Sequence, residues 1–425
     1  MKKKKWLLLV PVVLIIVGMN LLGTEKNTAH TFHTKSELTF FQNHLLSPID
    51  SDQYFLHSSR CQGCHGYDPL HIASTTNAGV DVNLYDDWET SMMANAAIDP
   101  LWRAKVSQEI LTNPSHSNEL QTKCTACHAP MGRFTAIYHG AAHYTIQDLE
   151  NDSLGLNGVA CGGCHMIGTN GLGSRFSGDI PYDTLFKEYG PFPNPMTGPM
   201  QLYVGLTPTY SDHMSEGRAC SACHTLLTNT ADLNGQLTGG TFVEQATFHE
   251  WLNSNAESDN ITCQKCHMPQ VTDSLQIANG QQGLQKRSPF NQHQFVGANW
   301  FMVHMIKDYK NQLGVGFKPD VNFDSTLAAT NRMLMNNSLN IHLNLDSLTT
   351  DTAFITLKLT NKAGHKFPSG YPARRAVVQF VLLDVNNDTI FKTGMFDTNF
   401  NVKNEDVPFE PHHNIINNEN EVQIY

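Results

Sequence analysis

The chain has 425 residues, with 39 acidic and 28 basic side chains and a formal net charge of −11. This acidic balance argues against nucleic acid as the partner, and it either attracts positively charged proteins or simply keeps the protein soluble. A hydrophobic content of 40%, with 30 Gly and 19 Pro, is low for a protein of this length that packs around a large core of its own.

The first 56 residues predict export from the cytoplasm. Four lysines follow the first methionine, and an apolar run then extends from Trp6 to Gly23. Residues 1–23 are expected to be an export signal or a membrane anchor, because the run is near the lower length limit for a membrane span and no typical cleavage site follows it. Residues 24–56 are polar and predict a stalk. The protein is therefore expected in the periplasm, or anchored to the inner membrane facing the periplasm.

The pattern C-x-x-C-H occurs five times and uses all ten cysteines. It is the attachment pattern of c-type haem, in which two thiols bond to one porphyrin and the adjacent histidine binds the iron. The sequence therefore predicts five covalently attached haems. The cysteines expected to hold them are Cys61, Cys64, Cys124, Cys127, Cys161, Cys164, Cys220, Cys223, Cys263 and Cys266, and the histidines expected to bind iron are His65, His128, His165, His224 and His267.

Other uses of paired cysteines fit this pattern less well. Zinc sites need a second pair or two further ligands, and they do not require a histidine after every second cysteine. A thioredoxin-like motif is expected once, and a disulfide framework has no reason to repeat this spacing. The intervals between the motifs are uneven, which favours one woven five-haem domain over residues 57–315 and not a series of equal repeats.

Helix signals in this region are short and interrupted. Apolar residues recur at helical spacing within residues 86–108, until Asp99 and Pro100 predict a break and a second helix. Residues 242–253 predict a short helix before the fifth motif, and residues 297–313 predict a last helix. The haem-binding region is thus expected to be mainly α-helical and irregular.

The pattern changes to period two towards the end of the chain. Residues 339–345 and 355–359 alternate apolar and polar side chains, which predicts two half-buried strands. A continuous apolar run at residues 376–385 precedes a hairpin turn signal. Residues 330–425 are therefore expected to form a small β-sandwich-like domain. The alternation continues to the last residue, so this domain is expected to be truncated.

Several stretches carry a family resemblance beyond the haem motifs. They are W-x-x-S-M-M from Trp88, CHAPMGR from Cys127, CQKCHMP from Cys263, HQFVGAN from His293 and GHKFPSGYPARR from Gly364. Together with the motifs they resemble the multihaem cytochromes c of the tetrahaem type, a group that extends to hydroxylamine oxidoreductase and cytochrome c nitrite reductase. The likeness covers roughly residues 55–425. It implies haems packed in alternating parallel and perpendicular pairs, and a second iron ligand drawn from a W-x-x-S-x-His stretch.

The second axial ligand of each iron is not assigned by spacing. An electron-transfer haem needs one, whereas a catalytic haem keeps one face open. Met93, at the last position of the W-x-x-S-x-His pattern, either binds iron or fills space beside a porphyrin. His365 could reach a haem or brace a turn. The residues proposed as second ligands are Met93, His116, His213, His293 and His365.

Other titratable residues are not expected to bind iron. His249 and His304 lie in predicted helices, and His342 lies on the polar face of a predicted strand. Arg374 and Arg375 are expected to hold haem propionates or the interface between the domains.

The leading functional hypothesis is electron transfer along five haems. It needs no dedicated catalytic residues, and the C-x-x-C-K motif of cytochrome c nitrite reductase does not occur in the sequence. The alternative is an oxidoreductase acting on a small nitrogen or sulfur compound at one haem with open coordination. A third hypothesis is a structural module docked through its β domain. Expected partners are redox proteins, among them membrane quinol-linked donors or other cytochromes, and the membrane through the N-terminal segment.

Overall fold

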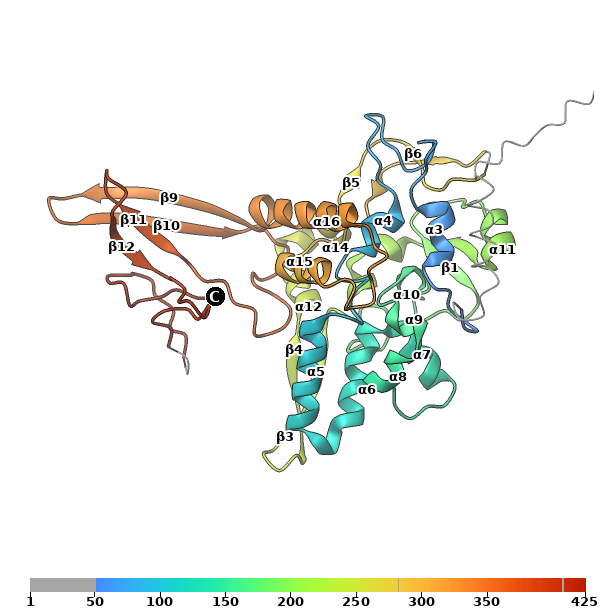
Figure 1. Ribbon diagram of the computed structural model, residues 1–425, viewed down its shortest axis with the longest axis horizontal. Helices are drawn as coiled ribbons and strands as arrows, with labels where there is room; N and C mark the ends of the chain where they lie inside the picture. The colour runs from blue at the N-terminus through green and yellow to red at the C-terminus, as the bar shows by residue number, and fades with distance from the viewer. Residues whose placement is uncertain (1–50, 282, 407–408) are drawn as a thin grey trace, which may run out of the picture.

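The computed structural model describes residues 51–281, 283–406 and 409–425. The predicted signal or anchor at residues 1–23, and the predicted stalk up to residue 50, lie outside the described residues. Figure 1 shows a body of short helices and strands, from which a β-rich lobe projects. No helix in the described ranges is long and apolar enough to cross a membrane.

The first half of the body consists of short helices joined by turns. The Leu101 N–H donates to Asp99 Oδ1 at 2.9 Å, and Pro100 occupies the first turn of the next helix. The predicted break at Asp99 and Pro100 is confirmed. The helices are α3 (Ser59–His65), α4 (Leu84–Glu89), α5 (Pro100–Thr112), α6 (Ser117–His128), α7 (Pro130–Tyr138), α8 (Ile146–Glu150), α9 (Ser153–Leu156) and α10 (Cys161–His165).

Residues 90–98 form turns, although their apolar spacing predicted a helix. The Asn95 side-chain amide donates to the backbone carbonyls of Ser91 at 2.7 Å and Glu89 at 3.3 Å. Such bonds from side chain to backbone compete with helical hydrogen bonds. The buried Lys318 Nζ donates to Glu89 O and to Asn95 Oδ1, both at 2.7 Å. The irregular segment is therefore held in place by specific polar contacts.

The second half of the body alternates helices with pairs of short strands. The predicted helices at 242–253 and 297–313 are present but shorter. Residues 242–245 belong to a strand, and the helix at Trp300–Asp308 covers only the centre of the second prediction. The helix at 297–313 was predicted to be the last, which is wrong, since a further helix follows at Asp320–Arg332. The helices are α11 (Gly198–Val204), α12 (Thr247–Leu252), α13 (Asn255–Ser258), α14 (Cys263–His267), α15 (Trp300–Asp308) and α16 (Asp320–Arg332). The strand pairs are β1 (Lys187–Gly190) parallel to β2 (Thr207–Tyr210), and three antiparallel pairs, β3 (Leu226–Ala231) with β4 (Leu237–Gln245), β5 (Gln270–Val271) with β8 (Phe290–Asn291), and β6 (Leu275–Gln276) with β7 (Lys286–Arg287).

The lobe contains two antiparallel hairpins. In the first, Leu343 pairs with Leu357 and the polar Asn344 pairs with Thr356, so the two predicted strands are confirmed. The prediction that they are half-buried is wrong for β9, because its apolar face is not covered in the described residues. The hairpins consist of β9 (Leu339–Leu348) with β10 (Ala353–Asn361), and β11 (Phe380–Leu383) with β12 (Thr389–Thr393).

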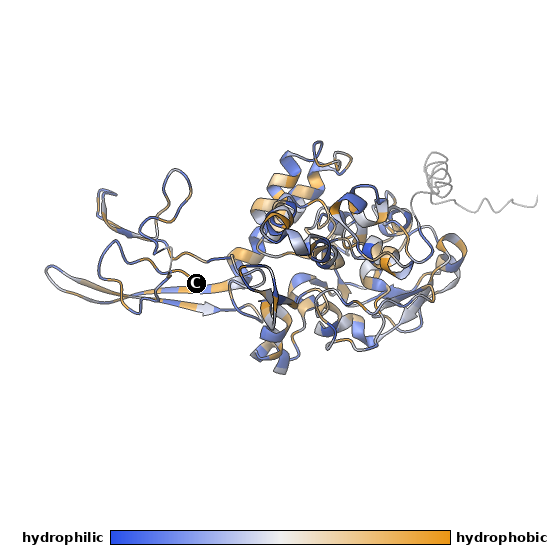
Figure 2. Cartoon of the chain, turned by 90° about the horizontal axis from the view of Figure 1, so that it is seen from below, coloured by the Kyte–Doolittle hydropathy of each residue, from blue (hydrophilic) through white to orange (hydrophobic). Residues whose placement is uncertain are grey.

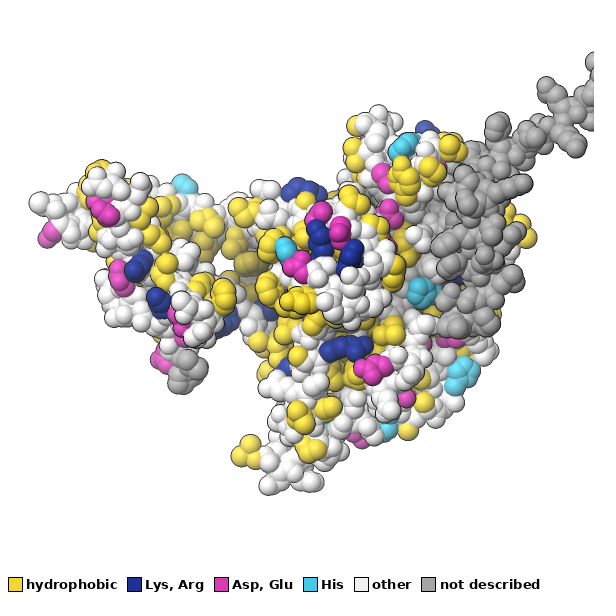
Figure 3. Space-filling view, viewed as in Figure 1, with side chains coloured by type: hydrophobic (Ala, Val, Ile, Leu, Met, Phe, Trp, Pro, Cys, Tyr) yellow, Lys and Arg dark blue, Asp and Glu magenta, His cyan; other side chains and the backbone are white. Residues whose placement is uncertain are grey.

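The two hairpins do not join into a larger sheet within the described residues. The apolar face of β9 is open, with Ile341 69%, Leu343 55% and Leu345 57% exposed. Figure 2 shows the projecting ladder with hydrophilic and hydrophobic residues intermixed, and Figure 3 shows apolar side chains on the surface of the lobe. A sandwich requires two packed sheets, so the predicted β-sandwich is not formed by the part of the chain that the structure describes.

Buried apolar side chains of the described residues fall into six small clusters and do not form one continuous core. One cluster joins Tyr54, Phe55 and Trp88 to Ala160, beside the third motif. The Trp88 indole N–H donates to Val159 O at 2.9 Å, which fixes this ring next to the motif. Members of several clusters, such as Trp88, Trp102 and Phe290, line the candidate site.

Candidate functional site

A cavity of about 3250 Å³ lies inside the body. A pocket for one small ligand measures about 300–1,000 Å³, so this cavity has room for several such groups. Its walls contain all ten cysteines and all five histidines of the C-x-x-C-H motifs. Motifs that are far apart in the sequence thus share one internal space.

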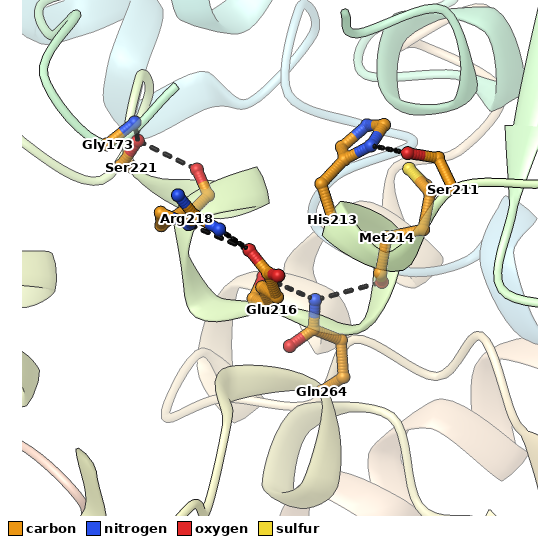
Figure 4. A network of polar contacts seen from close by, with 8 residues as sticks. All are labelled: Gly173, Ser211, His213, Met214, Glu216, Arg218, Ser221 and Gln264. Carbon is orange, nitrogen blue, oxygen red and sulfur yellow. Dashed lines mark hydrogen bonds and ion pairs between the residues drawn. The ribbon is translucent and has the colours of Figure 1, made fainter. Parts of the chain in front are cut away.

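Short helices present four of the five motifs, since α3, α6, α10 and α14 each end at the motif histidine. Residues three apart in a helix lie on the same face, so both cysteines of such a motif point the same way. The fourth motif instead follows a 3-10 turn at Gly217–Cys220. Gln264 in α14 donates to Met214 O at 3.1 Å and to Glu216 O at 2.9 Å (Figure 4), which ties the fifth motif to the segment before the fourth.

Four motif histidines are oriented by a backbone carbonyl. A carbonyl only accepts hydrogen bonds, so each Nδ1 must carry the proton and each Nε2 is left with its lone pair. This is the orientation in which a histidine binds a metal through Nε2. The Nδ1 partners are Ile277 O for His65 (2.9 Å), Ala96 O for His128 (3.0 Å), Tyr189 O for His165 (2.6 Å) and Val296 O for His267 (2.5 Å).

Burial keeps the motif histidines neutral, which is the form that binds a metal. It lowers the pKa of His128 and of His224 to about 4. It also lowers the pKa of His65, His165 and His267. The five imidazoles are therefore prepared as ligands before any metal is bound.

Two motif histidines face a second, nearly parallel imidazole. The ring centroids of His165 and His293 are 6.1 Å apart with an interplanar angle of 5°. Those of His267 and His365 are 6.3 Å apart with an angle of 8°. Two imidazoles on opposite sides of one metal ion would give about 6.2 Å, from two metal–nitrogen bonds of about 2 Å and two ring radii of about 1.1 Å. The structure therefore brings His293 and His365 to the spacing expected of second ligands.

The other predicted second ligands are placed differently. His213 is buried and does not line the cavity, and its Nδ1 lies 2.7 Å from Ser211 Oγ (Figure 4). Its Nε2 lies 2.9 Å from Ile167 O, so neither ring nitrogen is left for iron. His116 lines the cavity, but its Nε2 donates to Gly235 O at 2.7 Å. Met92 and Met93 both line the cavity, so ligation and space filling remain open for Met93.

Thiols of different motifs meet inside the cavity, and all ten cysteines are free. The hydrogen bond to Cys263 and burial hold the pKa of Cys220 well above its usual range, and the nearby Cys164 adds to this shift. The fourth motif therefore lies next to the third and the fifth. The pairs of thiols close enough to shift each other's pKa are Cys61 with Cys161, Cys127 with Cys223, and Cys220 with Cys263.

A segment that follows β10, residues 363–376, forms one wall of the cavity. Ser369 Oγ donates to Glu250 Oε2 at 2.7 Å, and the Lys366 N–H donates to the same oxygen at 3.1 Å. Ser254 Oγ donates to the carbonyl of Gly364 at 2.8 Å. These bonds fasten the segment to α12 and to the turn before α13, and they place His365 opposite the fifth motif.

The two arginines of this segment make different contacts. Arg374 lines the cavity, and its Nη1 donates to Ser369 O at 3.0 Å. This placement suits the predicted contact with an anionic group in the cavity. Arg375 instead forms ion pairs with Glu405 at 2.6 Å and Glu410 at 2.5 Å. Its charge is therefore already neutralised within the lobe.

Sequence reasoning missed two wall residues. The Trp102 ring lies flat on the His128 imidazole, with centroids 4.4 Å apart and an interplanar angle of 6°. Glu188 places a carboxylate beside the first and third motifs. No local pattern signals either position, because both depend on how distant segments fold together. Within the described ranges, no group of three or more His, Cys, Asp or Glu side chains is arranged to hold a bare metal ion.

Comparison of this chain with protein-family models, with curated proteins and with solved structures gave no match.

Proposed function

We propose that this protein is a multihaem c-type cytochrome that binds five haems covalently and carries electrons along them. The observation that carries the proposal is the single cavity walled by all five C-x-x-C-H motifs. Electron transfer slows steeply as the distance between cofactors grows, so a shared cavity favours conduction over isolated sites. Thiol contacts between motifs support the same conclusion.

The residues of the cavity fit haem. Ten free thiols and five neutral imidazoles, four of them oriented by backbone carbonyls, would supply the covalent and proximal bonds that C-x-x-C-H chemistry requires. Haem bound there would supply an iron that takes up and releases single electrons. His293 and His365 would add the second axial nitrogen at the third and fifth sites. Arg374 would offer a positive charge to the carboxylates of a porphyrin.

The thiol contacts propose an order for the sites. The first motif contacts the third through Cys61 and Cys161. The third lies beside the fourth through Cys164, and the fourth contacts the second and the fifth. In this order the fourth motif is a junction with three neighbours, the second, third and fifth motifs. The first motif is connected to it through the third.

One observation favours the alternative function, an oxidoreductase acting on a small nitrogen or sulfur compound. Among the described residues, no second imidazole faces His65, His128 or His224 at the spacing seen for the other two motif histidines. An iron without a protein ligand on one face could bind a substrate. Met93 and His116 line the same cavity and could instead fill such positions.

The proposed location is outside the cytoplasm, in the periplasm or on the periplasmic face of the inner membrane. The lysines and apolar run of residues 1–23 support export. Redox proteins are the proposed partners, because a net charge of −11 would repel nucleic acid and would attract positively charged proteins. A positively charged redox protein would be attracted most strongly at low ionic strength.

Haem content and spin state test the proposal. The intact exported protein should have the mass of the polypeptide plus five haems, because every motif keeps both thiols on the cavity wall. Electron paramagnetic resonance of the oxidised protein should then show five low-spin haems. A high-spin haem would favour the oxidoreductase instead. A protein that matures normally and carries no haem would contradict both functions.

Replacing His293 by Met should raise the reduction potential of one haem, because a thioether ligand favours reduced iron more than an imidazole does. Potentiometric titration followed by absorbance measures the shift. His304→Met is the matched control, since His304 is exposed on α15 and pairs with Asp308 at 3.1 Å. The control should titrate as the unchanged protein does. If His293→Met also titrates unchanged, His293 is not an iron ligand.

A further inference from the structure

Glu188 lies on the cavity wall between the first and third motifs. It belongs to β1, and the carbonyl of the next residue, Tyr189, accepts the hydrogen bond from His165 Nδ1 at 2.6 Å. A methyl group added at Gly162, inside the third motif, would meet Glu188 Oε1 at 3.7 Å. The strand that orients the third motif histidine therefore also holds a carboxylate beside the same motif.

No positive charge of the described residues stabilises this carboxylate. Burial is the sole cause that acts on the pKa of Glu188, and it raises that pKa to about 8. On its own strand, Lys187 approaches Asp183 at 3.9 Å. Helix α10, strand β2 and the turn at Asp212–Ser215 pack against β1, and they carry the titratable groups Cys161, Cys164, His165, Tyr210, Asp212 and His213. Arg60, Cys61, His65 and Tyr85 line the same cavity as Glu188, and Asp183 and Tyr189 lie near it along the chain.

Most of these neighbours are engaged elsewhere. Tyr189 Oη donates to Asp183, and Tyr210 Oη donates to Asp212. His213 is bonded through both ring nitrogens. Arg60 acts on the Cys61 thiol, where it opposes the rise in pKa caused by the hydrogen bond to Cys161 and by burial. Glu188 is thus a carboxylate in the haem cavity whose charge is balanced by none of these side chains.

We propose that Glu188 binds one proton when the haem at the first or third motif is reduced, an inference that rests on the proposed electron-transfer function. The electron comes from a one-electron donor protein or an electrode and converts iron(III) to iron(II). The proton comes from water and forms an O–H bond on a carboxylate oxygen of Glu188. Electron and proton together leave the net charge of the cavity unchanged.

Electrostatics gives the direction of this coupling. Oxidised iron adds one positive charge beside Glu188 and favours its ionised form, whereas reduction removes that charge. The pKa of Glu188 is therefore lower in the oxidised protein than in the reduced protein. Between these two pKa values, reduction draws a proton from solvent, and the reduction potential falls as pH rises. Below both values, or above both, the potential does not depend on this group.

Potentiometric titration of the five-haem protein between about pH 6 and pH 10 tests the proposal. In the unchanged protein, one potential should fall with pH in the range around 8, by up to about 59 mV per unit for one electron and one proton. Glu188→Gln should remove this dependence. A carboxylic-acid C=O band should also appear in the reduced-minus-oxidised infrared spectrum of the unchanged protein and be missing in Glu188→Gln.

Two further variants serve as controls. Glu188→Asp retains a carboxyl group and should keep the pH dependence. Glu244→Gln makes the same chemical change on the cavity wall beside the second motif, where Lys105 and Lys123 lie nearby, and should also keep it. A Glu188→Gln protein that binds five haems and keeps the full dependence would overturn the role of Glu188 and leave the electron-transfer function standing. Absence of haem from the unchanged protein would contradict that function itself.

Discussion

The chain is expected to be unfolded when it is produced without haem. The cavity measures about 3250 Å³, and its wall contains large apolar side chains such as Trp88, Trp102 and Phe248. Leaving such apolar walls without a filling group is destabilising, because they lose packing contacts and face water or empty space. Folded proteins have a net stability of only about 5–15 kcal/mol. The buried apolar side chains of the described residues form only small separate clusters, so little else compensates for the missing haems.

Circular dichroism and limited proteolysis measure this effect. Protein from cells that attach c-type haem should show helical signal, a cooperative thermal transition and resistance to protease. Protein from cells that lack the attachment machinery should lose all three across residues 57–315. A variant with both cysteines of every motif changed to serine, made in haem-competent cells, separates loss of haem from a change of host. Cooperative unfolding of either haem-free protein would show that the fold is independent of haem.

The attachment residues could be predicted from the sequence because their chemistry has a fixed local spacing. Two thiols must reach one porphyrin and the next residue must reach its iron, so the C-x-x-C-H pattern can be recognised from the sequence alone. All fifteen of these side chains do line one cavity. The pattern contains nothing about how the motifs lie relative to one another. That arrangement depends on the folding of the loops between them.

The proposed second ligands are not fixed by such a spacing. His293 and His365 were both proposed from the sequence, but they lie far along the chain from the histidines that they face, so no spacing rule indicated which motif each would face. His213 was proposed because it stands shortly before the fourth motif, but Ser211 and Ile167 occupy its two ring nitrogens. Nearness in sequence is a poor guide here, because an axial ligand must approach from the opposite face of the porphyrin.

Secondary structure was predicted correctly where it depends on residues close together in the sequence. The break at Asp99 and Pro100 and the paired strands β9 and β10 both appeared as predicted, although the apolar face of β9 is exposed. The helix prediction failed at residues 90–98. There the Asn95 side-chain amide donates to Ser91 O, and Lys318 Nζ donates to Glu89 O. Apolar spacing could not separate a helix from a segment that faces a cofactor cavity, since both place apolar side chains on one side.

Loss of the fourth haem site is expected to divide the electron path. Cys164 and Cys220 connect the third motif to the fourth, whereas Cys223 and Cys220 connect the fourth to the second and fifth. Changing Cys220 and Cys223 to Ala removes both thioether bonds at this junction. Electrons that enter at the fifth site should then no longer reach the first and third sites. The same change at Cys263 and Cys266 removes one haem at an end of the path and should leave the other four connected.

The His293→Met substitution makes this division measurable, because it should raise the potential of the third site and change its spectrum. In that background, a substoichiometric one-electron reductant should reduce the third site to a greater extent than in the unchanged protein, whichever site it reduced first. The variant at Cys263 and Cys266 should retain this redistribution. In the variant at Cys220 and Cys223, electrons should instead stay within two separate groups of haems. One group is at the first and third motifs, and the other is at the second and fifth. Equal redistribution in both variants would mean that the third site has another route to the remaining haems, and the fourth motif would then not be the junction.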